Sequence, residues 1–181
     1  SLFSSNFSDS TDTVSGGSSA NTLAGIAITS YTRDATKGEW QYSTNGSSWT
    51  TISSSISAAS SSLTFKSTDY LRFLPAANWN GSAPTLTVAL IDSSTTVTTN
   101  ATVDVSTRGG TTAYSSSTVT LSNTVNAVND APVASGSATL TAIDEDTANP
   151  SGATVSSLFS SNFSDSTDTV SGGSSANTLA G

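Results

Sequence analysis

Hydrophobic and polar residues alternate along short stretches of this chain, and polar turns separate the stretches. Residues 23–28 and 86–90 are two such runs, and residues 63–65 and 71–73 are shorter ones. Alternation with a period of two residues is typical of β-strands. The same pattern recurs at residues 40–42, 49–52, 101–105, 119–125 and 138–142. Together these runs predict an all-β protein.

Two local signals refine the prediction. Asn45-Gly46 lies between the runs 40–42 and 49–52, and both residues tolerate the positive φ of a tight turn, so a β-hairpin is expected there. Residues 155–163 place apolar side chains near i, i+3 and i+4, which predicts one short helix. The same spacing occurs at residues 2–7.

Many short strands without a long helical period predict an antiparallel, immunoglobulin-like β-sandwich. The chain has 181 residues and is 34% apolar, which is enough for a core. The expected core residues are Trp40, Trp49, Phe65, Phe73, Leu86 and Val88.

The sequence contains a long internal repeat. Residues 1–25 recur without a change as residues 157–181, which sets a period of 156 residues. Such a stretch arises from an array kept uniform or from a laboratory duplication, and we favour the array. The period is too long for a solenoid and indicates domains in tandem. It also exceeds the roughly 100 residues of a plain immunoglobulin-like domain, which leaves room for long loops and a short helix or for a small subdomain.

We place the boundary between successive modules near Pro132. Proline cannot donate a ladder hydrogen bond and holds its predecessor extended, as a stiff linker requires. Residues 1–130 are then the body of one module, whose first strand belongs to the preceding repeat. Residues 131–181 are the linker and opening segment of the next module. We expect residues 133–146 to form a partial sheet or to pair with an exposed strand edge, in cis or by strand exchange between fragments.

The composition excludes several kinds of function. The chain has no Cys and no His, so it has no thiol nucleophile, no Cys-based zinc site and no His-dependent triad. Asp12-Thr13-Val14 lacks the glycine of an aspartic-protease motif, and we predict that the protein is not an enzyme. No run approaches the roughly 18 apolar residues of a membrane span, so no membrane insertion is expected.

The distribution of charge is the most informative feature of the chain. The net charge of −8 argues against nucleic acid as a partner. Every basic residue lies between positions 33 and 108, and all charged residues after position 108 are acidic. Carboxylates that gather without cations must stay solvated, take up protons or bind a metal. The acids after position 108 are Asp130, Asp144, Glu145, Asp146, Asp165 and Asp168.

This distribution predicts a calcium site, because Ca²⁺ prefers six to eight carboxylate, amide and carbonyl oxygens. Asn129 and Asp130 would supply the linker side. The other candidates are Asp144, Glu145 and Asp146 after the next strand, Asp165 and Asp168 in the loop beyond, and Asp9 and Asp12 as the copies of that pair. The alternative is that these are solvated turn residues. Asp69, Asp92 and Asp104 are expected to be surface or turn residues.

The motif Asn129-Asp130-Ala131-Pro132-Val133 resembles the linker of cadherin-like modules. Together with the acids at 144–146 and 165–168 and the segments 23–27, 40–43 and 71–75, the chain resembles the tandem repeats of giant RTX-type biofilm adhesins of Gram-negative bacteria. The chain departs from the cadherin-like linker at Ala127, which stands where that linker has its first Asp, and it has no second Asn before Ala131.

The resemblance implies an extender module that holds a distal binding domain away from the cell surface for adhesion and biofilm formation. It also implies type I secretion to the extracellular side, calcium at the module junctions and neighbouring identical modules as partners. The alternative is a β-sandwich that binds glycans or surfaces by avidity, with Trp79 as the stacking ring.

Overall fold

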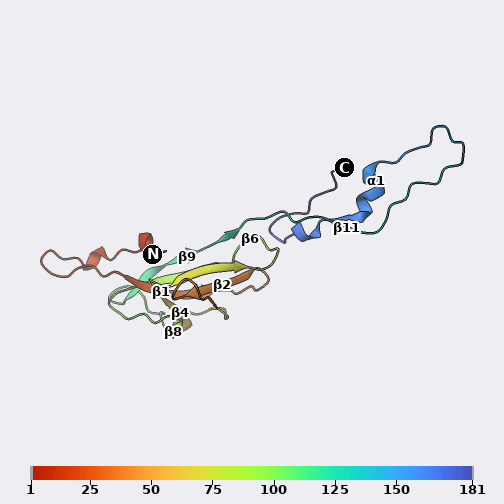
Figure 1. The fold of residues 1–181 in the computed structure, drawn as a ribbon. Coiled ribbons are helices and arrows are strands. Elements are labelled where there is room, and N and C mark those ends of the chain that lie inside the picture. Colours follow the sequence, from red (N-terminus) through yellow and green to blue (C-terminus); the bar gives the residue numbers. More distant parts are fainter. Residues whose placement is uncertain (1, 181) are drawn as a thin grey trace. The chain divides into compact units, whose positions relative to one another are not determined.

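The computed structural model describes residues 2–180, so residues 1 and 181, the outer ends of the two predicted domains, lie outside the described residues. The chain forms two compact units (Figure 1). The first unit comprises residues 2–76 and 82–125, and the second comprises residues 77–81 and 126–180. The loop 77–81 therefore belongs to the second unit, although the chain on both sides of it belongs to the first.

Two antiparallel sheets make up the first unit. One sheet has the strand order β8-β4-β1-β7-β9 and the other has the order β3-β2-β5. The first sheet consists of β1 (Leu23–Tyr31), β4 (Ser62–Lys66), β7 (Leu86–Asp92), β8 (Ala101–Val103) and β9 (Tyr114–Leu121). The second consists of β2 (Gly38–Ser43), β3 (Thr50–Thr51) and β5 (Tyr70–Pro75). The predicted all-β antiparallel sandwich is confirmed.

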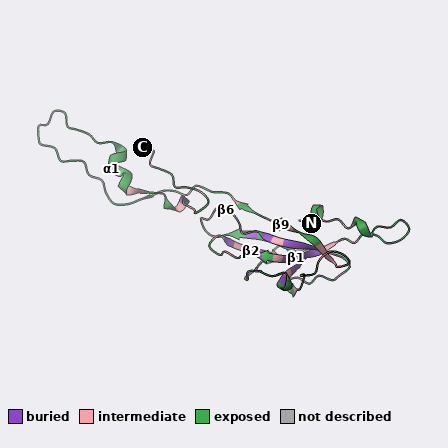
Figure 2. Cartoon of the chain, turned by 180° about the vertical axis from the view of Figure 1, so that it is seen from behind, coloured by how far each residue is buried: buried purple, intermediate pink, exposed green. Residues whose placement is uncertain are grey.

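The main core lies between these sheets. Ile26 of β1 is paired in register with Phe65 of β4 and Leu90 of β7, so all three side chains share one face of the sheet. The ring of Phe65 contacts Tyr42 of β2, with 4.9 Å between the ring centroids. Figure 2 shows the buried residues on the strands of this unit. The apolar faces of the two sheets thus cover each other.

Strand β1 is also covered on its opposite face. Ala27 packs in a cluster with Ile91, Val97 and Val105, and all four are buried. A strand covered on both faces carries consecutive apolar residues instead of strict alternation. This explains why residues 26–28 read Ile-Ala-Ile.

Trp40 is buried in this core, and its indole N–H has a hydrogen-bond partner. Its ring meets Phe73 edge-on at 5.6 Å between centroids, and its Nε1 donates a hydrogen bond to the Pro84 carbonyl at 2.6 Å. The predicted core residues Phe65, Phe73, Leu86 and Val88 are likewise buried.

Trp49 is the exception among the predicted core residues. It is only half-buried, because it precedes the two-residue edge strand β3. The Arg72 guanidinium lies over its ring, 4.1 Å from the centroid. The ring therefore supports a cation–π contact at the surface instead of filling the core.

The predicted hairpin joins β2 to β3, with Gln41 opposite Thr51. Gly46 has φ +74°, a conformation that glycine adopts without steric cost. The side-chain oxygen of Asn45 accepts hydrogen bonds from the amides of Ser47 and Ser48, both at 2.9 Å. The Asn-Gly signal therefore predicted this turn correctly.

Short elements complete the first part of the chain. A two-stranded ladder joins β6 (Gly81–Ser82) to β10 (Thr124–Val125). Three single turns of 3-10 helix are η1 (Ser4–Asn6), η2 (Ser10–Asp12) and η3 (Ala59–Ser61).

The second unit contains the predicted short helix. Helix α1 (Val155–Phe159) starts after Thr154, whose side chain accepts a hydrogen bond from the Ser157 amide at 3.1 Å. The remainder of the predicted helix, up to residue 163, is instead 3-10 helix η4 (Ser160–Asn162) followed by β12 (Phe163–Ser164). The same spacing at residues 2–7 gives only η1. Within residues 2–180 no helix has the length and apolar content of a membrane span.

Strand β12 pairs antiparallel with β11 (Val133–Ala134), which follows the linker proline. The last regular element of the described chain is η5 (Ser166–Asp168). A ladder between β11 and β12 thus joins the linker to the opening segment of the next repeat. Where one module ends remains a prediction.

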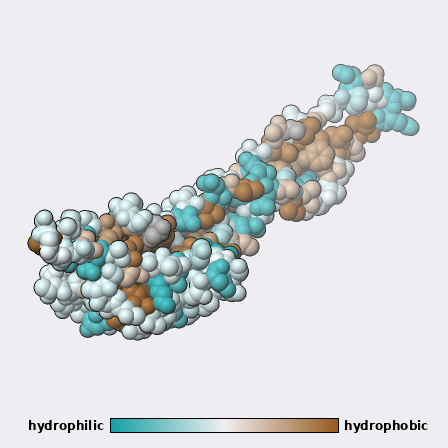
Figure 3. All heavy atoms as spheres, turned by 60° about the vertical axis from the view of Figure 1, so that its left-hand side comes forward, coloured by the Kyte–Doolittle hydropathy of each residue, from teal (hydrophilic) through white to brown (hydrophobic). Residues whose placement is uncertain are grey.

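The strand predicted at residues 138–142 is wrong. These residues form no ladder, and Leu140 and the adjacent Ile143 are exposed. An extended segment becomes a strand only where a free edge can satisfy its backbone groups, and no described strand pairs with these residues. Leu140 is thus an exposed apolar side chain of this unit, and Figure 3 shows hydrophobic residues, coloured brown, on the surface of the unit.

Candidate metal centre where two repeats meet

The two copies of the repeated 25-residue segment fold alike locally. In the first copy Asp9 precedes η2 with φ −131° and ψ 36°, and in the second Asp165 precedes η5 with φ −130° and ψ 37°. In both copies the backbone amide of an asparagine twelve residues later donates a hydrogen bond to this aspartate and closes the loop. Asn21 donates to Asp9 Oδ2 at 2.9 Å, and Asn177 donates to Asp165 Oδ2 at 2.7 Å. The segment therefore specifies its own loop.

The surroundings of the two copies differ. Asp12 is exposed and Asp9 is half-buried, whereas Asp165 and Asp168 are only 5% and 7% exposed. Because sequence and local backbone are the same, neighbouring residues must cause the difference. In the second copy those neighbours are the residues of the linker.

The linker contacts the aspartates through hydrogen bonds. The amide of Asp130 donates to Asp168 Oδ1 at 2.8 Å. The side-chain nitrogen of Asn177 lies 2.8 Å from Asn129 Oδ1 and 3.1 Å from Asp168 Oδ2. Asn177 thus connects both aspartates to the linker. Hydrogen bonds join five residues into one cluster: Asn129, Asp130, Asp165, Asp168 and Asn177.

One carboxylate oxygen in this group has no partner among the described residues. Asp165 Oδ1 is buried and accepts no hydrogen bond. A buried oxygen left unsatisfied costs free energy, and a buried carboxylate costs more unless a cation accompanies it. The sequence supplies no Lys or Arg after Arg108, so a side-chain cation is not available within the second unit.

These residues fit a hard divalent cation. The donor set consists of carboxylate oxygens from Asp165 and Asp168 and an amide oxygen from Asn129, which are the ligand types that Ca²⁺ prefers. Over residues 2–180, however, no three acidic side chains come together closely enough to hold a metal. A bound ion would therefore take its remaining oxygens from carbonyl groups and water. A site with few carboxylates binds Ca²⁺ weakly, in the range of about 10⁻⁴–10⁻³ M typical of extracellular modules.

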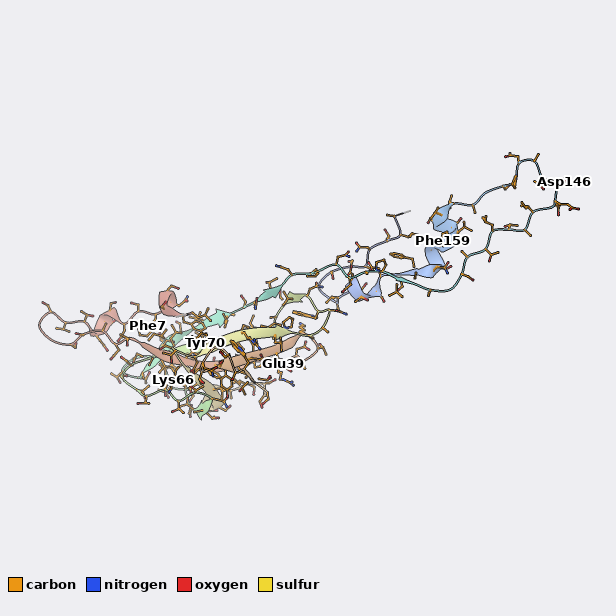
Figure 4. The ribbon with its side chains drawn as sticks, viewed as in Figure 1. Phe7, Glu39, Lys66, Tyr70, Asp146 and Phe159 are labelled. Atoms are coloured by element: carbon orange, nitrogen blue, oxygen red, sulfur yellow. The ribbon has the colours of Figure 1, made fainter. Side chains whose placement is uncertain are left out.

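The acids at 144–146 lie elsewhere in the second unit. All three are exposed, and Asp146, with φ +63°, lies at the outer end of the loop between β11 and α1 (Figure 4). Asp144 uses its backbone carbonyl to accept a hydrogen bond from the Thr147 hydroxyl at 2.7 Å. The structure does not bring these carboxylates to Asp165 and Asp168, and their role as ligands stays a prediction.

Sequence reasoning overlooked two contributors to the site. The sequence marks Asp130 by its carboxylate, but its backbone amide makes the contact with Asp168. The acidic residues of the repeated segment do not by themselves identify Asn177. The recurrence of an asparagine at the same distance from each Asp-x-x-Asp pair was the available signal.

Three other acids have local roles, as predicted. Asp92 and Asp104 each accept hydrogen bonds from a serine two residues later, and Asp69 accepts one from the Lys66 amide at 2.8 Å. The hydroxyl and amide of Ser106 lower the pKa of Asp104. These carboxylates stabilise turns.

Comparison of the chain with protein-family models, with curated proteins and with solved structures finds no match.

Proposed function

We propose that this chain is a spacer from a tandem array of identical modules on the outside of a bacterial cell. Each module would hold a distal adhesive domain away from the surface, and Ca²⁺ would stiffen the joint between neighbours. The joint is the region where residues 126–135, on both sides of the boundary near Pro132, meet the opening segment of the next repeat, residues 157–180. No catalytic step is part of this proposal.

The observation that carries the proposal is the burial of Asp165 and Asp168 against the linker. These two carboxylates belong to the second repeat, whereas Asp130, whose amide contacts Asp168, belongs to the first. An ion held by both sides would restrict the angle between modules, whereas repulsion between uncompensated carboxylates would loosen the joint without it. The exact repetition of residues 1–25 favours a spacer, because a spacer needs many equivalent units.

Calcium titration of thermal unfolding tests the metal at the joint. An ion that binds only the folded joint raises its stability by mass action, so millimolar Ca²⁺ should raise the melting temperature of the second unit. Asp168→Asn should raise the Ca²⁺ concentration needed for half of this increase at least about tenfold.

The repeat provides a matched control. Asp12→Asn makes the same chemical change in the same local sequence, but away from the linker, and should leave the calcium response unchanged. Equal responses of the two variants would show that the ion, if any, does not bind at the joint.

Scattering on a chain of several repeats tests the spacer role. Calcium should extend the particle and excess chelator should shorten it, because the joints become flexible. Equal lengths under both conditions would refute the stiffened joint, whatever the titration shows.

A further inference from the structure

The loop formed by residues 78–81 contacts the next repeat directly. Asn78 has φ +58° and Gly81 has φ +119°, so two residues that tolerate positive φ turn the chain sharply on either side of Asn80. Asn80 is only 9% exposed. The turn therefore points the Asn80 side chain into the second unit and not into solvent.

Asn80 makes a two-way hydrogen-bonded contact with Ser174. Its Nδ2 donates to the Ser174 hydroxyl at 2.8 Å, and its Oδ1 accepts from the Ser174 amide at 2.9 Å. These residues are 94 positions apart and belong to different repeats. A side-chain amide that uses both its donor and its acceptor on one residue recognises that residue specifically.

Two glycines allow this close approach. A Cβ on Gly173 would lie 2.8 Å from the Asn80 carbonyl oxygen and would overlap the Asn80 side-chain oxygen. Ideal Cβ placement at Gly81 also comes within 3.3 Å of the Gly172 carbonyl oxygen. The two loops therefore fit together through backbone surfaces that any larger residue would separate.

The first copy of the repeat displays the same loop without a partner over it. We define the opening loop as residues 165–174, with residues 9–18 as its first copy. Gly16 and Gly172 have φ +75° and +77°. The amide of Val14 donates to the Ser18 carbonyl at 3.0 Å, and the amide of Val170 donates to the Ser174 carbonyl at 2.9 Å. The opening loop thus has one backbone conformation whether or not Asn80 contacts it.

We infer that residues 78–81 form a latch that binds the opening loop of the following module without any metal. The partner is a second copy of the same module, and the recognised features are the Gly172-Gly173-Ser174 backbone and the Ser174 hydroxyl. This inference relies on the proposed tandem array only for the identity of the partner. The latch and the candidate metal centre would act on the same joint through different residues.

The test is amide hydrogen exchange of the 181-residue chain in excess chelator, so that no metal contributes. Gly173→Ala introduces a Cβ that collides with Asn80, and it should speed exchange of the Ser174 amide at least about tenfold. Asn80→Ala removes both hydrogen bonds and should have a similar effect. The thermal unfolding of the first unit should not change in either variant.

Gly17→Ala is the matched control, because a Cβ there meets only Val14 at 3.4 Å, an ordinary contact. It should leave exchange at Ser174 as in the unmodified chain. Unchanged exchange in both Gly173→Ala and Asn80→Ala would overturn the latch, and so would an equal loss of protection in Gly17→Ala. Since chelator is present throughout, failure of the calcium site would leave this result unaffected.

Discussion

The amide of Asp130 donates a hydrogen bond to the carboxylate of Asp168, which lies 38 residues further along the chain. The contact crosses from one copy of the repeat to the next and buries an acidic side chain that is exposed in the other copy. The identical segments thus act as an internal comparison, and differences between them report the influence of the linker.

Asp165→Asn should lower the stability of the second unit only when calcium is present. Without metal, the change removes one charge from a pair of buried carboxylates while an oxygen remains to accept the Asn177 amide, so unfolding of the second unit should shift to the same or a higher temperature. With millimolar calcium the variant should be less stable than the unmodified chain. Calorimetry under both conditions measures the difference, and a variant that is less stable in chelator would contradict this account.

Phe3→Ala and Phe159→Ala should differ in cost, although both change the same residue of the repeat. Phe3 is 6% exposed and borders a small cavity with Leu23, Phe65 and Leu71, whereas Phe159 is 44% exposed. Removal of a buried phenylalanine costs about 3–5 kcal/mol, and removal of the exposed ring should cost less than about 1 kcal/mol. Denaturant unfolding of both variants tests the prediction, which fails if the costs are equal.

Tyr31 should make the first unit sensitive to alkali. Burial and the nearby charge of Glu39 raise the pKa of this tyrosine, which is 1% exposed. A raised pKa in the folded state means that stability is complete below the unfolded value of about 10 and falls as the pH rises beyond it.

Tyr31→Phe should therefore reduce the loss of stability above about pH 10. Melting temperatures of both proteins between neutral and alkaline pH give the comparison. An identical alkaline slope in the two proteins would mean that another group titrates.

Trp79→Ala separates the spacer from a glycan-binding module. Trp79 is half-buried beside Gly81, in the loop that carries Asn80. If the chain is a spacer, Trp79→Ala should loosen that loop and leave the result of a glycan array unchanged. A glycan array probed with a multi-repeat chain provides the measurement. Binding that disappears in the variant would support the alternative function.

The sandwich was predictable because its strands carry strong local signals. The alternating runs identified β1, β4, β5 and β7, and Asn45-Gly46 identified the hairpin. The run at 138–142 has the same pattern but forms no strand, since alternation describes a side-chain preference and cannot supply a neighbouring edge. Trp49 was misplaced for a related reason, because its sequence does not reveal that β3 is a short edge strand.

The candidate site was predictable only in part. Acids without nearby cations identified Asp165 and Asp168, and their burial depends on contacts with the linker. Outside this site, the contact of Asn80 with Ser174 could not be deduced either, because the two residues are 94 positions apart and the fit depends on a backbone amide and two glycines. The backbone amide and the glycines carry no distinctive side-chain signal.

The preformed backbone of the opening loop bears on how an array could assemble. A loop that already has its docked shape loses little conformational freedom when a neighbour arrives. Contacts of this kind form by collision and alignment of surfaces, without a slow search for a new fold. In the proposed array, each contact between residues 78–81 and the following opening loop would therefore form independently of the others.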